Sequence, residues 1–512
     1  MDDPLLSDSS TSDDQITSPI PQQPISFFQM FVLLSNFTIG VGFLSFPFVF
    51  AQIGLRLGIL VTLLFSFVCF LSYKFLAETM SRVDIVLDLE QDLFTNMVRL
   101  CRPKFESSSK QYEVPELVEV FIGKQWKFFY QVLLIFSLTS GLICFCSAAA
   151  GTLTTFFVLP LVTEPDHCFM TTTNWLSDCK LAYRFYLVVF IAFVTFLSSK
   201  EVSCQSKFQV YLYFFRIVTV FLCCLTVIVE STRHPFVPPS DPPPRPTGST
   251  LQYLDWNFSQ LASVFPLIFF AFFSHHCIPS LVASLKDKLA TKSVLAYSSI
   301  CTSLLYLLFG SVCFLYFRNS SGPVVTLLWR FFPWDSPSRN PNLTIFQHIL
   351  TSLIFIQVPV ICVSAYPLHA NVLKNVVFDV FFPREKKKDL EIKTLVFVAK
   401  LCLFSTTLIP FIIAFYFDHT YNITLIHTIT GLIVSFIFPA LLHLASREKC
   451  ISIWNSNVSN QNSLTSVFSR PIFAYFTIFF SIFVIIFCVL NSLNSGIFRI
   501  IFCLGCRSYS EL

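Results

Sequence analysis

Eleven apolar segments, each long enough to cross a lipid bilayer, set the first limit on the fold of this chain. A transmembrane helix needs about 20 apolar residues. The segments cover residues 27–51, 57–79, 128–160, 182–199, 206–229, 257–284, 295–317, 344–371, 395–417, 424–446 and 471–494. Only 12% of the 512 residues are charged, whereas a soluble chain carries about 25%. The sequence therefore predicts an all-α integral membrane protein that crosses the bilayer about eleven times.

The segments outside the spans divide the rest of the chain. Residues 1–26 contain five Asp and no Lys or Arg, together with several Ser and Pro. This composition predicts a disordered acidic tail and gives no sign of a cleavable signal peptide. We expect a membrane-embedded core over residues 27–446, then a cytosolic loop and an eleventh helix over 447–494, and a C-terminal tail over 495–512.

The distribution of basic residues predicts the orientation. Loops after even-numbered spans hold 21 Lys and Arg, against 10 on the opposite side. The positive-inside rule then places the even-side loops and the N-terminus in the cytosol. Sequons at Asn319 and Asn342 fall in one loop on the predicted outer face, where we expect glycosylation. Cys168 and Cys179 flank another outer loop, where an oxidising compartment favours a disulfide.

The first span carries polar and small residues at membrane depth. Asn36, Thr38, Gly40 and Gly42 stand within seven residues of one another. Lipid offers no hydrogen-bond partners, so unwound backbone persists there only where it lines a cavity or packs on protein. An interrupted helix of this kind indicates the binding site of a transporter. The alternative is that Gly40 and Gly42 simply let two helices pack closely.

The sixth span is interrupted in a similar way. His275, His276 and Pro279 lie in the middle of an apolar run, and Pro279 removes a backbone donor. The interruptions fall in the first span of each of two five-span groups. Because five is odd, the second group enters the membrane the opposite way round, as in inverted-repeat transporters. The alternative is that the histidines are interior polar residues satisfied by neighbouring backbone.

The charges inside the spans limit the solute. No Asp or Glu is expected deep in any span, and Arg216 is the clear cation at mid-span. Its simplest role is to contact backbone carbonyls. A site without fixed carboxylates suits a zwitterion, whose carboxylate meets free N–H groups at a half-helix N-terminus.

Four segments resemble motifs of the amino acid/auxin permease family. They are residues 36–44 with Pro47 and Gly54, residues 270–275, residues 358–368 and residues 430–441. The resemblance implies a LeuT-like five-plus-five inverted repeat with an extra C-terminal helix, the repeats covering residues 27–229 and 257–446. It also implies alternating-access transport of amino acids. The residues that it places at the substrate are Thr38, Ile39, Gly40, Val41, Gly42, Phe270, Phe273 and Ser274.

The same resemblance bears on the coupling ion. Asn36 matches the Asn that sodium-coupled members of the family use near their cation, but Gln357 stands where those members lead one to expect a hydroxyl-bearing region. Ser364 lies two turns later and is a substitute candidate. A proton is the favoured ion, because the unperturbed imidazole of a residue such as His275 or His276 changes charge near neutral pH. No cofactor is expected beyond H⁺ or Na⁺. No metal is expected either, since Cys503 and Cys506 form a lone Cys-x-x-Cys pair.

Other functions and locations stay open at this stage. An amino acid sensor of the same fold, or a transporter of another small zwitterion, fits the same motifs. No catalytic motif of an enzyme is present, and no basic cluster interleaved with aromatics indicates nucleic acid. The expected partners are an amino acid and the lipid bilayer, and the oligomeric state is undetermined. Residues 2–6 match an Asp-x-x-Leu-Leu sorting signal, which leaves a vacuolar or lysosomal membrane and the plasma membrane as alternatives.

Overall fold

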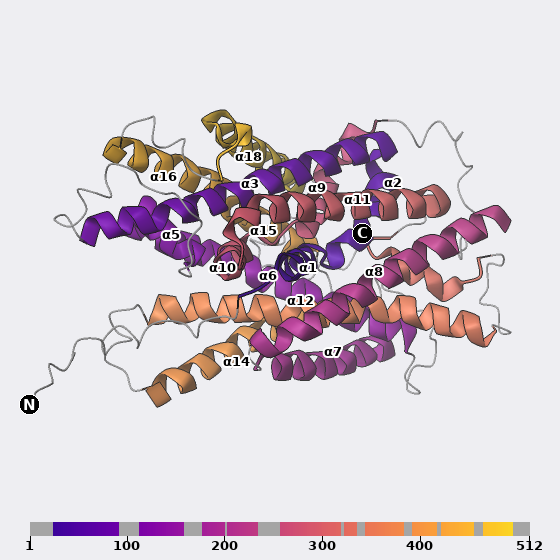
Figure 1. The fold of residues 1–512 in the computed structure, drawn as a ribbon. Coiled ribbons are helices and arrows are strands. Elements are labelled where there is room, and N and C mark those ends of the chain that lie inside the picture. The colour runs from indigo at the N-terminus through magenta and orange to yellow at the C-terminus, as the bar shows by residue number, and fades with distance from the viewer. Residues whose placement is uncertain are drawn as a thin grey trace, which may run out of the picture.

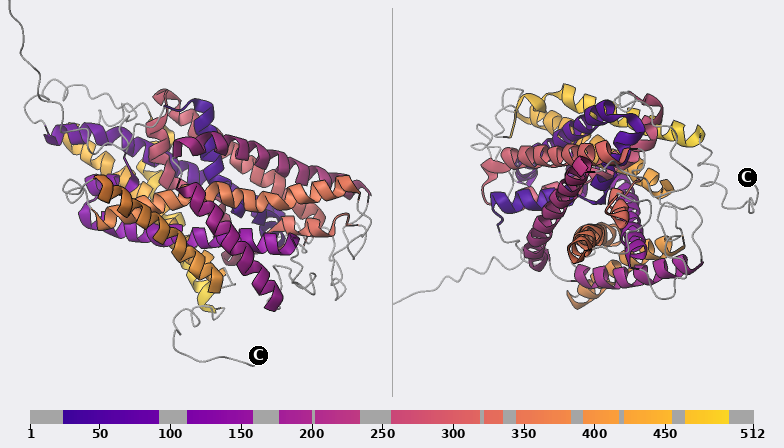
Figure 2. Two further views of the ribbon diagram at one scale, coloured as in Figure 1. Left: turned by 90° about the horizontal axis from the view of Figure 1, so that it is seen from below. Right: turned by 90° about the vertical axis from the view of Figure 1, so that its right-hand side faces the viewer.

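The computed structural model describes most of the hydrophobic part of the chain. The described residues are 24–91, 112–157, 177–199, 202–233, 256–318, 322–334, 344–382, 392–416, 421–454 and 464–494. They form a bundle in which the long helices run side by side (Figure 1), and Figure 2 shows the same bundle from below and from one end. Within these ranges the only extended pairing is an isolated bridge between Ile25 and Leu285.

The helices of the described residues confirm the predicted number of spans. Ten are long and apolar enough to cross a membrane, and one bent pair brings the number to eleven. The unbroken spans are α3 (Leu55–Gln91), α6 (Lys124–Phe156), α7 (Ser177–Ser198), α8 (Val202–Arg233), α11 (Thr291–Phe317), α12 (Ile345–Phe381), α14 (Ile392–Tyr416) and α18 (Pro471–Asn494). The chain is therefore an all-α, multi-pass membrane protein.

The first span is broken where the sequence predicted. It consists of α1 (Phe27–Thr38), the 3₁₀ turn η1 (Val41–Ser45) and α2 (Phe46–Ile53), and the two halves meet at an angle of 55°. Ser26 and Gln29 form a capping box that starts α1. Pro47 lies in the first turn of α2, where its fixed φ suits the start of a helix.

The sixth span is broken too. It consists of α9 (Leu261–Ala271), the 3₁₀ turn η5 (His275–Cys277) and α10 (Ile278–Ser284). Pro279 lies in the first turn of α10, so it begins the second half-helix and does not itself interrupt a turn. The unwound residues are Phe272 to Ser274, just before the two histidines.

The two broken spans are joined at both ends. At the predicted cytosolic end, the Ile25 N–H donates to the Ser284 carbonyl at 2.9 Å, and the Lys286 N–H donates to the Ile25 carbonyl at 3.0 Å. At the opposite end, Asn257 donates from its backbone to the Ile53 carbonyl at 3.1 Å and from its side chain to the Gln52 carbonyl at 2.9 Å. Each half of span 1 is thus tied to a half of span 6.

The tenth span contains a feature that the sequence did not indicate. A π-helical turn, η9 (Ile433–Ile437), separates α15 (Tyr421–Leu432) from α16 (Phe438–Trp454). Phe436 in this turn packs edge-on against Phe269 at 5.7 Å and His275 at 5.1 Å between ring centroids. Because π turns interrupt the regular helical ladder and are frequent at functional sites, this turn directs attention to span 6.

Candidate functional site

The two breaks meet at a cluster of hydroxyl groups. The Thr38 hydroxyl at the end of α1 lies 3.0 Å from the Ser274 hydroxyl in the break of span 6. Tyr73 of α3 hydrogen-bonds to Ser274 and lies 3.3 Å from Thr38. All three side chains are buried. The structure therefore brings together Thr38 and Ser274, two of the predicted substrate-binding residues, and adds Tyr73, which the sequence did not indicate.

The carbonyl groups freed at the breaks are held by two side chains. The Tyr306 hydroxyl of α11 lies 2.9 Å from the Thr38 carbonyl and 2.7 Å from the Ala271 carbonyl, so it bridges the C-terminal ends of α1 and α9. The buried Arg216 guanidinium donates to the Asn36 carbonyl at 3.2 Å and to the Ile39 carbonyl. A cation at a helix C-terminus is stabilising, and the predicted carbonyl-binding role of Arg216 is confirmed.

The opposite ends of the half-helices are not capped by their own N-cap residues. In the described part of the chain, Gly40 before η1 has no side chain, and the side chain of Ser274 before η5 makes no capping hydrogen bond. The first backbone N–H groups of a helix have no intrahelical acceptor, and they carry the positive end of the helix dipole. Since η1 and α2 continue as one helical segment from Val41 to Ile53, the N-terminus of this segment suits an anionic group such as a carboxylate.

Two of the predicted ion-coupling residues, Asn36 and Ser364, meet in one hydrogen-bond network. The Asn36 amide donates to the Gln209 side-chain oxygen at 2.5 Å and to the Ser364 hydroxyl at 3.3 Å. Ser364 in turn donates to the same Gln209 oxygen at 2.6 Å. Gln357 is buried on α12 but lies outside this network, with Cys223 as its sulfur contact at 3.9 Å. Gln209 has no local sequence signal, because its partners come from spans 1 and 8.

The two adjacent histidines of span 6 pack against different neighbours. His275 packs against Tyr73 at 4.7 Å. His276 packs against Phe273 at 5.2 Å and against His369 of α12 at 5.0 Å. Phe270, another predicted site residue, lies 5.1 Å from His427 of α15. His369 and His427 were missed by the sequence analysis, because a lone histidine in an apolar span carries no pattern.

The two glycines of span 1 differ in the space around them. A Cβ atom added to Gly42 would lie 2.7 Å from the backbone nitrogen of Ala271, closer than real Cβ contacts occur. A Cβ atom added to Gly40 would have its nearest neighbour at 3.9 Å, in the Phe145 ring. Gly42 therefore permits the close approach of the two broken spans, the packing role that the sequence had left as an alternative. Val41 and Ile39 beside them are buried.

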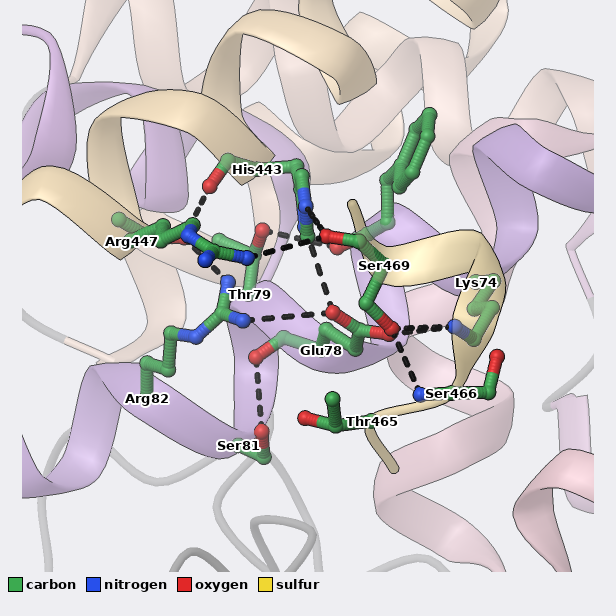
Figure 3. Close-up of polar contacts among 12 residues, drawn as sticks. Lys74, Glu78, Thr79, Ser81, Arg82, His443, Arg447, Thr465, Ser466 and Ser469 are labelled. Atoms are coloured by element: carbon green, nitrogen blue, oxygen red, sulfur yellow. Dashed lines mark hydrogen bonds and ion pairs between the residues drawn. The ribbon is translucent and has the colours of Figure 1, made fainter. Parts of the chain in front are cut away.

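A second polar cluster surrounds a buried carboxylate near the end of span 2. Span 2 continues to Val83, so Glu78 lies inside it and is fully buried. Figure 3 shows its surroundings. Lys74 lies 2.8 Å and Arg82 3.3 Å from the Glu78 carboxylate. Glu78 stands at the end of the predicted segment 57–79, whereas α3 continues beyond it to Gln91.

The same carboxylate joins three helical segments. The Ser469 hydroxyl, in the turn η10 (Val467–Ser469) before α18, donates to Glu78 at 2.5 Å. His443 of α16 places Nδ1 3.4 Å from Glu78 and Nε2 2.9 Å from the Ser469 carbonyl. The Lys74, Glu78 and Arg82 spacing of four residues, on one face of α3, was the available sequence signal. We call these five residues the Glu78 cluster.

One outer-loop prediction reaches the described residues. Cys179 is disulfide-bonded, while its predicted partner Cys168 lies outside the described residues, as do Asn319 and Asn342. The expected result is that mass spectrometry of the non-reduced protein finds a Cys168–Cys179 linked peptide, because a short loop in an oxidising compartment favours the pair. Recovery of Cys168 as a free thiol after alkylation would contradict the pairing.

The geometry defines a class of protein: a multi-pass helical membrane protein in which two broken spans meet at a buried polar site. The family described as "Transmembrane amino acid transporter protein" matches residues 23–494, so the chain belongs to this family. It is also 26% identical over 505 residues to a transmembrane protein 104 homolog of Dictyostelium discoideum, covering 86% of this chain and 92% of the relative. A transmembrane protein 104 homolog of Caenorhabditis elegans is 23% identical over 514 residues, covering 90% and 94%.

Proposed function

We propose that this protein carries amino acids across a membrane by alternating access, as a secondary active transporter. The observation that carries the proposal is the meeting of the two broken spans. Their C-terminal carbonyls are held by Arg216 and Tyr306, while the N-terminal end of η1 has no side-chain cap. A substrate carboxylate would bind these free N–H groups, with Thr38 and Ser274 beside them.

The coupling ion in this proposal is a proton. Arg216 already places a positive charge on the Asn36 and Ile39 carbonyls, which are the kind of oxygen atoms that a sodium ion would use. Two unit charges 5 Å apart repel by about 3 kcal/mol at an effective dielectric constant of about 20. The Ser364 hydroxyl is occupied, because it donates to Gln209 and accepts from the Asn36 amide. The buried Asn36 Oδ1 has no hydrogen bond from a described residue, and it would be a cation ligand if sodium were the coupling ion.

Flux through the full-length protein in proteoliposomes tests the proposal. We expect uptake of labelled amino acids when a pH gradient is imposed, with little requirement for sodium. Replacement of His275 or His276 by alanine should change the pH dependence of uptake, because both imidazoles lie at the break of span 6. His348, which is exposed at the start of α12, supplies the matched control His348→Ala.

The outcomes separate the alternatives. Uptake that needs sodium and does not respond to the pH gradient would identify sodium as the coupling ion. The proposal of amino acid transport would then still stand. Amino acid binding without flux would indicate a sensor of the same fold. If only a different zwitterion binds, the proposed substrate is wrong, while the description of the site geometry stands. Immunolocalisation of the full chain distinguishes a vacuolar or lysosomal membrane from the plasma membrane.

A further inference from the structure

Three buried imidazoles surround one phenyl ring beside the candidate site. The Phe273 ring lies 4.7 Å from His427, 5.2 Å from His276 and 6.2 Å from His369, measured between ring centroids. The histidines come from α15, η5 and α12, which are far apart in the sequence. Each is at least nine-tenths buried. We call His276, His369 and His427 the imidazole cluster.

Backbone carbonyl groups fix the tautomers of two of these rings. The His369 Nδ1 lies 2.9 Å from the Ala365 carbonyl, and the His427 Nδ1 lies 2.8 Å from the Ser137 carbonyl. A carbonyl oxygen only accepts hydrogen bonds, so each Nδ1 carries the hydrogen. In a neutral imidazole the other nitrogen is then an acceptor. His369 and His427 therefore both present Nε2 as a lone pair.

The acceptor on His427 has no partner in the structure. Its Nε2 is buried without a hydrogen bond from any described residue. Both ring nitrogens of His276 are also buried without a hydrogen-bond partner among the described residues. Buried polar atoms are normally hydrogen-bonded, and an orphaned acceptor is destabilising. A neutral His276 contributes one N–H donor and one acceptor, so the orphaned nitrogens comprise two acceptors and one donor. This indicates that a polar group from outside the chain, with hydrogen-bond donors of its own, belongs there.

The imidazole cluster borders both helix breaks. Phe37 in the last turn of α1 lies 6.2 Å from His276 and 6.1 Å from His369. Phe145, the nearest neighbour of Gly40, lies 5.4 Å from His369. A substrate whose carboxylate lies at the N-terminal end of η1 would therefore direct its side chain toward these rings.

Charge selects among the side chains that could bind here. The buried carboxylates of the described residues are Glu78 and Glu230; Glu78 belongs to the Glu78 cluster, and Glu230 lies 3.7 Å from Arg233. Neither is positioned to neutralise a cationic side chain, and an unpaired buried charge is strongly disfavoured. A carboxylate offers no hydrogen to two lone pairs. An uncharged group with N–H donors satisfies the orphaned His427 acceptor without a charge.

We propose that His369 and His427 form a specificity subsite that accepts hydrogen bonds from an uncharged donor group, such as a carboxamide, on the side chain of the amino acid substrate. This inference rests on the proposed transport function. His369 and His427 are the specificity-determining residues, and Phe273 supplies an apolar ring that contacts both.

Competition against uptake of labelled glutamine by the full-length protein in proteoliposomes tests the subsite. Glutamine has the carboxamide, methionine has a similar length without a donor, glutamate replaces the amide by a carboxylate, and lysine adds a cation. We expect glutamine to compete at least tenfold better than each of the other three, because only its side chain is an uncharged donor. This series uses the wild-type chain and needs no variant.

Substitution then assigns the effect to the two rings. His427→Phe and His369→Phe keep a planar ring and remove the acceptor, so glutamine uptake should fall at least tenfold while methionine uptake persists. Retained methionine uptake also shows that the variant is folded. His348→Phe on the exposed part of α12 should leave the ratio of glutamine to methionine unchanged.

Each contrary outcome has a distinct meaning. Equal competition by methionine or lysine, or an unchanged ratio in both phenylalanine variants, would overturn the subsite while amino acid transport stands. Preference for glutamate would show that the imidazoles bind as protonated donors and would also overturn it. If no amino acid binds to the wild type, the proposed function fails, and the subsite with it.

Discussion

A Glu78→Leu variant should lose about 3–5 kcal/mol of folding free energy, because removal of one partner of a buried ion pair leaves the other charge uncompensated. Lys74 and Arg82 are both almost completely buried beside Glu78. The turn η10 would also lose the Ser469 contact that holds it on α3. Thermal unfolding of the purified full-length protein in detergent, with the yield of monodisperse protein, measures the effect.

The chain offers a matched control for this prediction. Glu119 pairs with Lys127 at 2.5 Å, but the two side chains are 41% and 25% exposed. Exposed pairs contribute about 0–1 kcal/mol, so Glu119→Leu should change the unfolding temperature little. Equal effects of the two variants would show that the Glu78 cluster is not a buried ionic contact between α3, α16 and η10.

Gly42→Ala should sharply reduce the amount of folded protein. The added Cβ would lie 2.7 Å from the Ala271 nitrogen and 2.9 Å from the Ala271 Cα. Both atoms are backbone, so relief requires separation of η1 from α9 rather than a side-chain rotation. Overpacking of a tight contact costs about 1–3 kcal/mol. Gly42→Leu should be more severe. Fluorescence-detected size-exclusion chromatography and thermal unfolding measure the loss.

Gly40→Ala is the companion variant, two residues away in the same break. Its Cβ would have ordinary contact with the Phe145 ring at 3.9 Å, so the thermal stability should stay close to that of the wild type. If Gly42→Ala were as stable as Gly40→Ala and only transport were lost, the close approach to Ala271 would not be the reason for a glycine at position 42.

The sequence predicted those parts of the fold that depend on local composition. The spans are recognisable because about 20 apolar residues in a row have few other structures available. The breaks at Gly40 and before His275 are also local, since polar or small residues interrupt the apolar run at or directly beside each break. For these reasons the number of spans and the two interruptions agree with the structure.

The side chains that complete the site could not be predicted in this way. Tyr306, Gln209 and His427 reach the breaks from spans 7, 5 and 10, and nothing in their immediate neighbours distinguishes them from ordinary interior residues. Their importance arises from long-range packing, which one sequence does not encode in any short pattern. Glu78 was missed for a different reason: it stands at the edge of an apolar segment, where a charged residue normally reaches water.

The π turn at Ile433–Ile437 sets the angular position of one half of span 10 relative to the other. A helix advances by about 100° per residue, and a π turn holds more residues than an α turn. The residues after η9 are therefore rotated relative to where a continuous α-helix would place them. His427 before the turn faces the broken helices, and His443 after it faces α3. One span thereby presents histidines in two unrelated directions, and the length of this turn determines the angle between them.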